Sequence, residues 1–300
     1  MKSIRQKLML TICLVLILGI GALSVLNYIQ SSQIFTVKIV EAHKTVAEAA
    51  AKMAGLWFDE RRSYFRVLSD LPAVKNGQRD AAMSAMLSVI KVASPDIESV
   101  FLADTSGHYF DTLGKAGEFE VADFFERVLT TQNVAISKAF ISSSGKTAIT
   151  MGFPVMENKQ VIGVVGGVLP VEKLAKRIGD VDLGVTGYAY VVEEGGMIVF
   201  HPKKEVAMKQ NALQDITDDP KFIEAIKDVG KKESGVIQYS VGEIQYSSAY
   251  FAVPKTRLTV FTAAPADKLM FETRTIGVVM AGAGSLVLLL LVLILGEKNG

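Results

Sequence analysis

The chain has 300 residues, half of them hydrophobic, and its formal net charge at pH 7 is only +1. A chain with so little net charge lacks the basic field that attracts nucleic acid, so we expect no nucleic-acid partner. The single cysteine, Cys13, lies inside an apolar run, which excludes a disulfide scaffold for the rest of the chain.

Two uncharged apolar runs, residues 8–26 and 275–296, stand near the ends of the chain. A bilayer core needs about 20 apolar helical residues, so each run is predicted to cross the membrane once. The first run could instead be a cleaved signal peptide, because residues 22–24 resemble a cleavage site. The helical pattern continues directly out of this run, which favours an uncleaved anchor.

The basic residues Lys2, Arg5 and Lys7 precede the first run and favour a cytoplasmic N-terminus. Two crossings then return the C-terminus to the cytoplasm and leave the long middle segment outside. The predicted topology has cytoplasmic ends at residues 1–7 and 297–300, and an extracytoplasmic region at residues 27–274.

Residues 28–71 contain no proline and a single glycine, Gly55, and they follow a helical pattern. Positions three and four apart form a mostly apolar stripe, which is typical of a helix packed against a partner. The partner is either the chain's own domain or a second copy, and we expect a homodimer. The stripe comprises Val40, Lys44, Ala47, Ala51, Ala54, Phe58, Arg61, Phe65 and Leu68.

Pro72 and Asn76-Gly77 end this helix, and a second helix is predicted at residues 79–93, so the helical part occupies residues 28–94. Apolar and polar residues then alternate with period two, which predicts strands in a membrane-distal module (95–180) and a membrane-proximal module (181–270). The distal module has predicted strands at 97–103, 109–112, 147–156 and 161–169, and helices at 121–130 and 171–178. The proximal module has predicted strands at 188–193, 197–200, 235–240, 245–253 and 258–264, and helices at 220–229 and from 265 or 266 onward.

Hairpin, helix and further antiparallel strands occur in both modules, which predicts an α+β fold with helices packed on two antiparallel sheets. The sequence "GVTGYAYVVEEGGMIVFHPKKEV", with Tyr188, Tyr190, His201 and Pro202, resembles the membrane-proximal half of the double Cache domain. "SGKTAITMGFPVMENKQVIGVVGGVLPVEKL" is similar to the distal half of that domain. This resemblance extends over residues 28–274, and it implies two PAS-like modules, a bacterial inner (plasma) membrane location and a role in extracytoplasmic sensing.

No pattern of catalytic residues is visible in the chain. His43, His108 and His201 lie far apart, and no metal-binding pair, nucleophile elbow or phosphate loop is present. We therefore predict no enzyme, no metal and no cofactor. His201 is expected to end a strand with a local hydrogen bond, and the glycines of "IGVVGGV" are expected to allow close packing.

In the family that the chain resembles, ligands bind the distal module between its sheet and the short helix. Amino-acid-binding members carry Arg-x-Trp at that helix and an acid on the last strand. This chain has "ADFF" at the helix, without the arginine, and it lacks the acid around Val168 on the last strand. Binding of free α-amino acids by that mode is therefore not expected. The predicted ligand-binding residues are Tyr109, Phe110, Asp111, Asp123, Phe124, Phe125, Phe140, Thr147 and Met151.

An aromatic wall with one carboxylate suits an amine or a flat, largely apolar compound, since cations are attracted to aromatic faces. Two alternatives stay open: the phenylalanines are simply core residues, or Lys138 and Lys146 select an anion. The resemblance predicts the sensory part of a chemoreceptor, with a small organic ligand and the lipid bilayer as partners. The alternatives are the sensory part of a histidine kinase or cyclic-dinucleotide enzyme, or a two-span polysaccharide chain-length regulator.

Overall fold

The computed structural model describes residues 4–93, 96–119, 123–179, 187–229, 231–266 and 282, without most of the side chains of residues 4–40. The helices are α1 (Ile4–Asp70), α2 (Pro72–Lys75), α3 (Arg79–Ala93), α4 (Asp123–Thr131), α5 (Val171–Gly179) and α6 (Pro220–Lys227). The strands of the distal module are β1 (Ser99–Asp104), β2 (His108–Asp111), β3 (Ala116–Glu118), β4 (Ala135–Ile136), β5 (Phe140–Ile141), β6 (Thr147–Glu157) and β7 (Gln160–Pro170). Those of the proximal module are β8 (Tyr188–Glu193), β9 (Ile198–Phe200), β10 (Ser234–Val241), β11 (Ile244–Ala252) and β12 (Leu258–Pro265).

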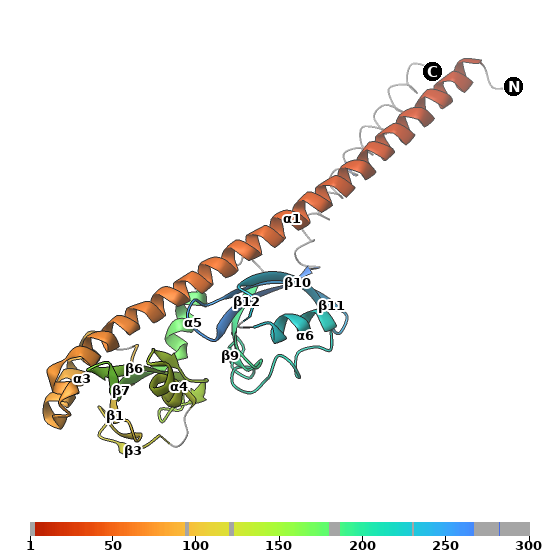
Figure 1. Ribbon diagram of the computed structural model, residues 1–300. Helices are drawn as coiled ribbons and strands as arrows, with labels where there is room; N and C mark the ends of the chain where they lie inside the picture. The colour runs from red at the N-terminus through yellow and green to blue at the C-terminus, as the bar shows by residue number, and fades with distance from the viewer. Residues whose placement is uncertain are drawn as a thin grey trace.

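Helix α1 is 67 residues long, and it runs along both modules and extends past them on its N-terminal side (Figure 1). The predicted stripe packs on the chain's own modules, because its residues from Ala47 to Leu68 are buried, whereas Lys44 is exposed. Leu71 takes an extended conformation before Pro72, with φ −67° and ψ 134°, which ends the helix at Asp70. The amphipathic helix predicted from the sequence is thus confirmed over this range.

The two sheets share one strand order. In the proximal sheet the order is β10-β11-β12-β8-β9, so the first strand of the module lies beside the last. The distal sheet has the same order when it is listed from its β4 edge. Strands β4 and β5 both pair with β6, then β7, β1 and β2 follow, and β3 is added outside β2. All of these pairings are antiparallel, as the α+β prediction requires.

Each sheet is covered on both faces. Helices α1 and α3 pack on one face of the distal sheet, and α4 packs on the other (Figure 1). The proximal sheet packs against α1 on one face and α6 on the other. Helix α6 begins as the sequence suggests, since the Asp219 side chain accepts a hydrogen bond from the N–H of Lys221 and Pro220 follows directly.

Two glycines of β7 allow close packing on opposite faces of the distal sheet. A Cβ on Gly167 would lie 2.5 Å from Cζ of Phe65 in α1, and a Cβ on Gly166 would lie 2.7 Å from Cζ of Phe101. Neither distance is compatible with a side chain, so both positions require glycine. The expectation that "IGVVGGV" serves packing is confirmed.

The sequence patterns missed four short elements, namely α2, β3, β4 and β5. These have two to four residues each, too few for a periodic pattern to register. The predicted span at 8–26 falls within α1, and the span at 275–296 falls outside the described residues apart from residue 282. Among the described residues, no helix combines the length and the apolar character needed to cross a membrane.

Candidate ligand-binding site

The strand register of the distal sheet decides which side chains face α4. Residues alternate between the two faces of a strand, and directly paired residues share a face. On β1, Phe101 and Ala103 contact the α4 side, whereas Val100 and Leu102 belong to the core beneath α1. Through the pairings Ala103–Tyr109 and Phe101–Asp111, the side chains of Tyr109 and Asp111 also face α4.

Five rings gather between α4 and the sheet, and we call them the aromatic cluster: Phe101, Tyr109, Phe119, Phe124 and Phe125. The ring of Phe119 is central, since its centroid lies 4.5 Å from that of Tyr109, 5.5 Å from that of Phe124 and 5.5 Å from that of Phe125. Phe124 and Phe125 are buried. These contacts confirm that α4 presents both phenylalanines to the sheet.

Helix α4 aims two adjacent phenylalanines inward because its apolar residues lie on one face. Phe124, Phe125 and Val128 are buried, while Asp123 and Glu126 point outward. Gly152 on β6 makes room for this helix, since a Cβ there would meet the Phe124 ring at 3.2 Å. The packing thus depends on a small residue opposite a large one.

Asp111 is the buried acid on this face, and its Oδ1 is already engaged. It accepts hydrogen bonds from the N–H groups of Leu113, at 2.9 Å, and Lys115, at 2.8 Å. These bonds hold the turn that follows β2. An ammonium ligand would therefore have to bind the second carboxylate oxygen, Oδ2.

Two more predicted residues lie at the edges of this region. Phe140 pairs with Ala148, which shares the α4 face with Gly152, so Phe140 stands on that face of the sheet. Asp123 begins α4 but turns outward, and its Oδ2 lies 3.1 Å from Nη1 of Arg257 in the proximal module. Arg127, which the sequence analysis overlooked, donates to the carbonyl of Ile136 and so braces α4 against β4.

Three predicted residues are not brought to the α4 side. Met151 is buried in the core beneath α1, and Thr147, four residues earlier on the same regular strand, shares its face. Phe110 also packs against that core. The physical reason is strand alternation, because three consecutive residues such as Tyr109, Phe110 and Asp111 cannot all face one way.

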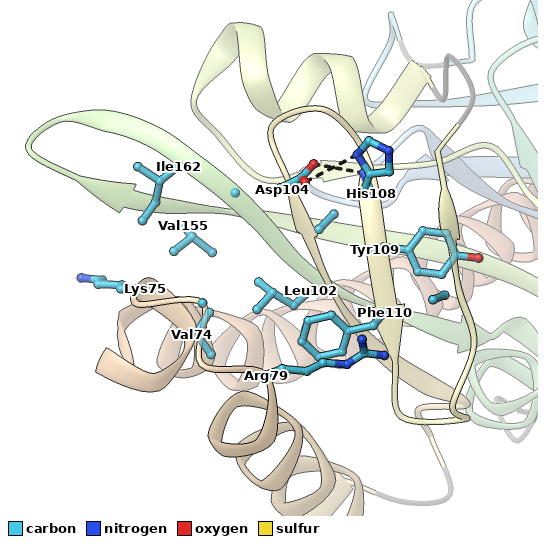
Figure 2. A pocket seen from close by; sticks show the side chains of 14 residues that line it. Val74, Lys75, Arg79, Leu102, Asp104, His108, Tyr109, Phe110, Val155 and Ile162 are labelled. Carbon is cyan, nitrogen blue, oxygen red and sulfur yellow. Dashed lines mark hydrogen bonds and ion pairs between the residues drawn. The ribbon is translucent and has the colours of Figure 1, made fainter.

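The opposite face of the distal sheet carries a cavity of about 370 Å³ between the α2–α3 corner and the strands, and we call it the α3-side cavity (Figure 2). Phe110 lines this cavity, and so does part of Tyr109. The other lining side chains are Val74, Lys75, Arg79, Leu102, Ala103, Asp104, His108, Ala116, Val155 and Ile162, with Gly77 and Gly163.

His201 in the proximal module has the local role that the sequence predicted. Its Nδ1 accepts a hydrogen bond from the N–H of Lys203 at 3.0 Å, just past the end of β9. Its ring centroid lies 5.0 Å from that of Tyr188 and 5.9 Å from that of Tyr190. Burial lowers the pKa of His201, which favours the neutral ring that accepts this bond.

Sequence reasoning missed Phe101 and Phe119 as members of the aromatic cluster. Phe101 was detectable, because it lies in a predicted strand whose hairpin partner already carried Tyr109. Phe119 follows a three-residue strand that the sequence did not reveal. Within the described part of the chain, no group of three or more His, Cys, Asp and Glu side chains is arranged to hold a metal.

Comparison with known proteins agrees with this architecture. Residues 31–272 match the family described as Cache domain, in its double form dCache_1. Methyl-accepting chemotaxis protein PscA of Pseudomonas syringae pv. tomato is 19% identical over 276 residues, which are 86% of this chain and 44% of PscA. The chain therefore spans less than half the length of this relative.

Two solved structures have the same fold. The ligand-binding domain of the Pseudomonas fluorescens chemoreceptor CtaA, in complex with L-isoleucine, has a TM-score of 0.64 at 16% identity, over 80% of this chain and 98% of that one. The extracellular domain of a protein described as a histidine kinase, mmHK1S-Z2, also has a TM-score of 0.64 at 16% identity, over 76% and 99%. Because the family match covers most of the sequence, the chain belongs to the double Cache family.

Proposed function

We propose that this chain is the sensory part of a chemoreceptor, which binds a small organic molecule outside the cell and transmits the binding event across the membrane. The observation that carries the proposal is the double Cache match over residues 31–272, together with the chemotaxis protein among its relatives. A ligand transmits a signal only if its affinity differs between two states of the protein. The long helix α1, which contacts both modules, is the element that such a change would move.

The sensory part of a histidine kinase is the second candidate, and the likeness to mmHK1S-Z2 favours it. The same sensor fold serves both kinds of output, so the distinction lies in the signalling partner. A hybrid that joins residues 1–300 to the signalling half of a chemotaxis receptor tests the first candidate. We expect an active ligand to change the activity of the chemotaxis kinase in cells, and a hybrid that binds ligand without any kinase response would favour the second.

The proposed binding site lies between α4 and the distal sheet. Its walls are the aromatic cluster, and its polar groups on the same face are Asp111 and Thr150. An arginine aimed at a ligand carboxylate is missing from the first turn of α4, which begins Asp123-Phe124-Phe125. An amine or a flat, largely apolar compound fits this lining better than a free amino acid does.

A binding titration of the full chain in lipid nanodiscs tests this site. The probes are phenethylamine as an aromatic amine, indole as a flat apolar compound, and L-leucine as a zwitterion. We expect saturable binding of phenethylamine or indole and weaker binding of L-leucine. Phe124→Leu should weaken the binding, because it removes one wall of the site.

Phe222→Leu is the matched control, since Phe222 is equally buried but lies in the proximal core. Each substitution removes a similar amount of buried ring surface, so a general loss of stability would affect binding in both variants alike. Binding lost in Phe222→Leu but kept in Phe124→Leu would contradict the proposed site. A folded chain that binds none of the three probes would contradict the proposed ligand class.

We further propose that residues 8–26 and 275–296 cross the inner membrane and that residues 27–274 lie outside the cytoplasm. The supporting observations are the uncharged runs and the basic residues ahead of the first run. Cysteine labelling in intact cells tests this topology at the exposed Lys159, on the β6–β7 turn, and Lys231, on the turn after α6. Lys159→Cys and Lys231→Cys should react with a membrane-impermeant reagent.

The proposed homodimer uses the face of α1 that is turned away from the sheets. Apolar residues recur there, and Leu56 and Val67 are 69% and 63% exposed. Ala49 and Met53 extend the same stripe at helical spacing. Glu60 and Ser63 stand on this face between Leu56 and Val67, and exposed apolar side chains bordered by polar residues are typical of a surface that another protein covers.

A further inference from the structure

The α3-side cavity and the aromatic cluster lie on opposite faces of the distal sheet. Leu102 and Phe110 face the cavity, whereas their neighbours Phe101 and Tyr109 carry the rings of the aromatic cluster. The cavity volume of about 370 Å³ falls within the range of small-molecule sites, roughly 300–1,000 Å³. A molecule in this cavity would therefore not occupy the site proposed above.

The floor and one wall of the cavity are apolar. Figure 2 shows Leu102, Phe110, Val155 and Ile162 rising from the strands, with Val74 opposite them on α2. Apolar walls of this kind bury the hydrocarbon part of a ligand. A ligand made only of charged groups would leave this surface without a partner.

Arg79 supplies the charge at the rim. Its guanidinium carbon lies 5.0 Å from the centroid of the Phe110 ring, so the side chain lies along this ring at the edge of the cavity (Figure 2). No acid among the described residues forms an ion pair with Arg79, so its five N–H donors remain open to an anion. Lys75 is nearby, but its Nζ already lies 3.2 Å from Oδ1 of Asp70.

The acid in the lining, Asp104, is committed to its own turn. Its Oδ1 accepts hydrogen bonds from the N–H groups of Ser106 and His108, at 2.9 Å and 3.0 Å, and its Oδ2 lies 3.6 Å from Nδ1 of His108. A cationic ligand would thus compete with existing bonds. An anion at Arg79 would not.

We propose that the α3-side cavity is a second binding site, which takes a small organic acid with one carboxylate and an apolar body. The carboxylate pairs with the guanidinium of Arg79, in the two-pronged geometry that this pair favours, and the apolar body lies on Leu102, Val155 and Ile162. This site does not depend on the one between α4 and the sheet.

Calorimetric titration of the full chain in nanodiscs tests the proposal, with empty nanodiscs as the blank. Pentanoate is the probe, acetate supplies the head group alone, and pentan-1-ol supplies the body alone. We expect saturable binding of pentanoate and binding at least about tenfold weaker for the other two, because each lacks one of the two interactions.

Two variants and a control locate the probe. Arg79→Met removes the charge, and Ala116→Glu places a competing carboxylate at the exposed cross-strand partner of Phe110. Each should weaken pentanoate binding by about tenfold or more, the effect of losing one charge-assisted hydrogen bond. Arg66→Met, at an exposed arginine of α1, should leave it unchanged.

Undiminished binding in Arg79→Met would overturn the proposal, as would absence of pentanoate binding to the wild type at millimolar concentrations. If Phe124→Leu abolishes pentanoate binding while Arg79→Met does not, the acid binds between α4 and the sheet instead. That last result would reject the second site, whereas the first proposal stands or falls with the binding of phenethylamine and indole, so the two proposals fail separately.

Discussion

Arg257 of the proximal module and Asp123 of the distal module form an ion pair, with Nη1 of the arginine 3.1 Å from Oδ2 of the aspartate. Asp123 is the first residue of α4, the helix that carries Phe124 and Phe125, and Arg257 lies just before β12. The Nε of the same arginine lies 3.2 Å from Oε2 of Glu194, which directly follows β8. One guanidinium thus ties the helix of the proposed site to two turns of the other module.

This pair is predicted to steady α4 without adding much global stability. Exposed ion pairs contribute about 0.2–1 kcal/mol, so Arg257→Gln should barely change the free energy of unfolding. The amides of α4 should nevertheless exchange hydrogen faster, by up to about fivefold, because the helix loses its tether. Hydrogen-exchange mass spectrometry measures this directly.

The control for this experiment is Glu194→Gln, which leaves the contact to Asp123 in place and should leave α4 unchanged. Equal exchange of α4 in the wild type and in Arg257→Gln would show that the pair has no role in holding this helix.

Arg61 is a buried cation whose loss should destabilise the distal module strongly. Its side chain is 2% exposed, pairs with Asp96 and Glu60, donates to the carbonyl of Trp57 and stacks 4.4 Å from the Trp57 ring centroid. Arg61→Ala leaves these groups unpaired, and we expect a loss of about 3–5 kcal/mol in the free energy of unfolding. Urea denaturation is the measurement.

Arg61→Lys should lower the free energy of unfolding by less than Arg61→Ala does, since lysine keeps the charge but not the planar guanidinium. Arg66→Ala, one turn further on the exposed side of α1, should change the free energy of unfolding by less than about 0.5 kcal/mol. A similar midpoint for Arg61→Ala and Arg66→Ala would mean that the buried pairs contribute nothing net.

Glu193 gives the stability a specific pH dependence. Burial raises the pKa of this carboxyl above its ordinary value of 4.5, although its Oε2 accepts the N–H of Ala139 at 2.9 Å and Lys138 and Arg257 are near. The folded state therefore holds this proton more tightly than the unfolded state does. The stabilisation from this group is complete below pH 4.5 and is lost as the pH rises through the raised pKa.

Glu193→Gln keeps an acceptor for Ala139 but cannot ionise. Relative to the wild type, the variant should therefore gain stability as the pH rises from 4 to about 7. Lys138→Met removes a cation that lowers the pKa of Glu193, so the gain from Glu193→Gln should be larger in that background. Unfolding curves at several pH values measure both effects, and a gain that shrinks with rising pH would contradict the sign.

Gly167 is predicted to tolerate no side chain. A Cβ there would lie 2.5 Å from Cζ of Phe65 and 2.8 Å from the carbonyl oxygen of Ser99, so Gly167→Ala should cost about 1–3 kcal/mol. Gly55→Ala is the control, because its Cβ would approach only the Pro254 ring, at 3.2 Å, and alanine favours the helix. Thermal or urea unfolding should separate the two variants clearly.

The proposed dimer predicts a change of association state. Leu56→Glu puts a charge on the exposed apolar face of α1 and should shift the full chain in detergent from dimer to monomer in sedimentation velocity. Arg66→Glu, on the same helix but off the apolar stripe, should not. Monomeric wild-type protein would rule out this use of α1.

The sequence by itself determined the long helix, both modules and most of their strands. These follow from local patterns, since buried positions recur every three to four residues along α1, whereas β6 and β8 are short, largely apolar runs that end at turns. Phe124 and Phe125 were also identifiable, because they stand next to each other at the start of a short amphipathic helix. The local role of His201 could also be predicted, because the N–H group that donates to its ring belongs to Lys203, only two residues away.

Only the tertiary structure decided which side chains meet. Strand register sends Phe110 and Met151 to one face of the distal sheet and Tyr109 to the other, and register is set by pairing with distant strands. The contact between Asp123 and Arg257 joins residues that are 134 positions apart, and the α3-side cavity arises where a helical corner meets residues of β1, β2, β3, β6 and β7. Such relationships depend on how elements pack, and no local pattern encodes them.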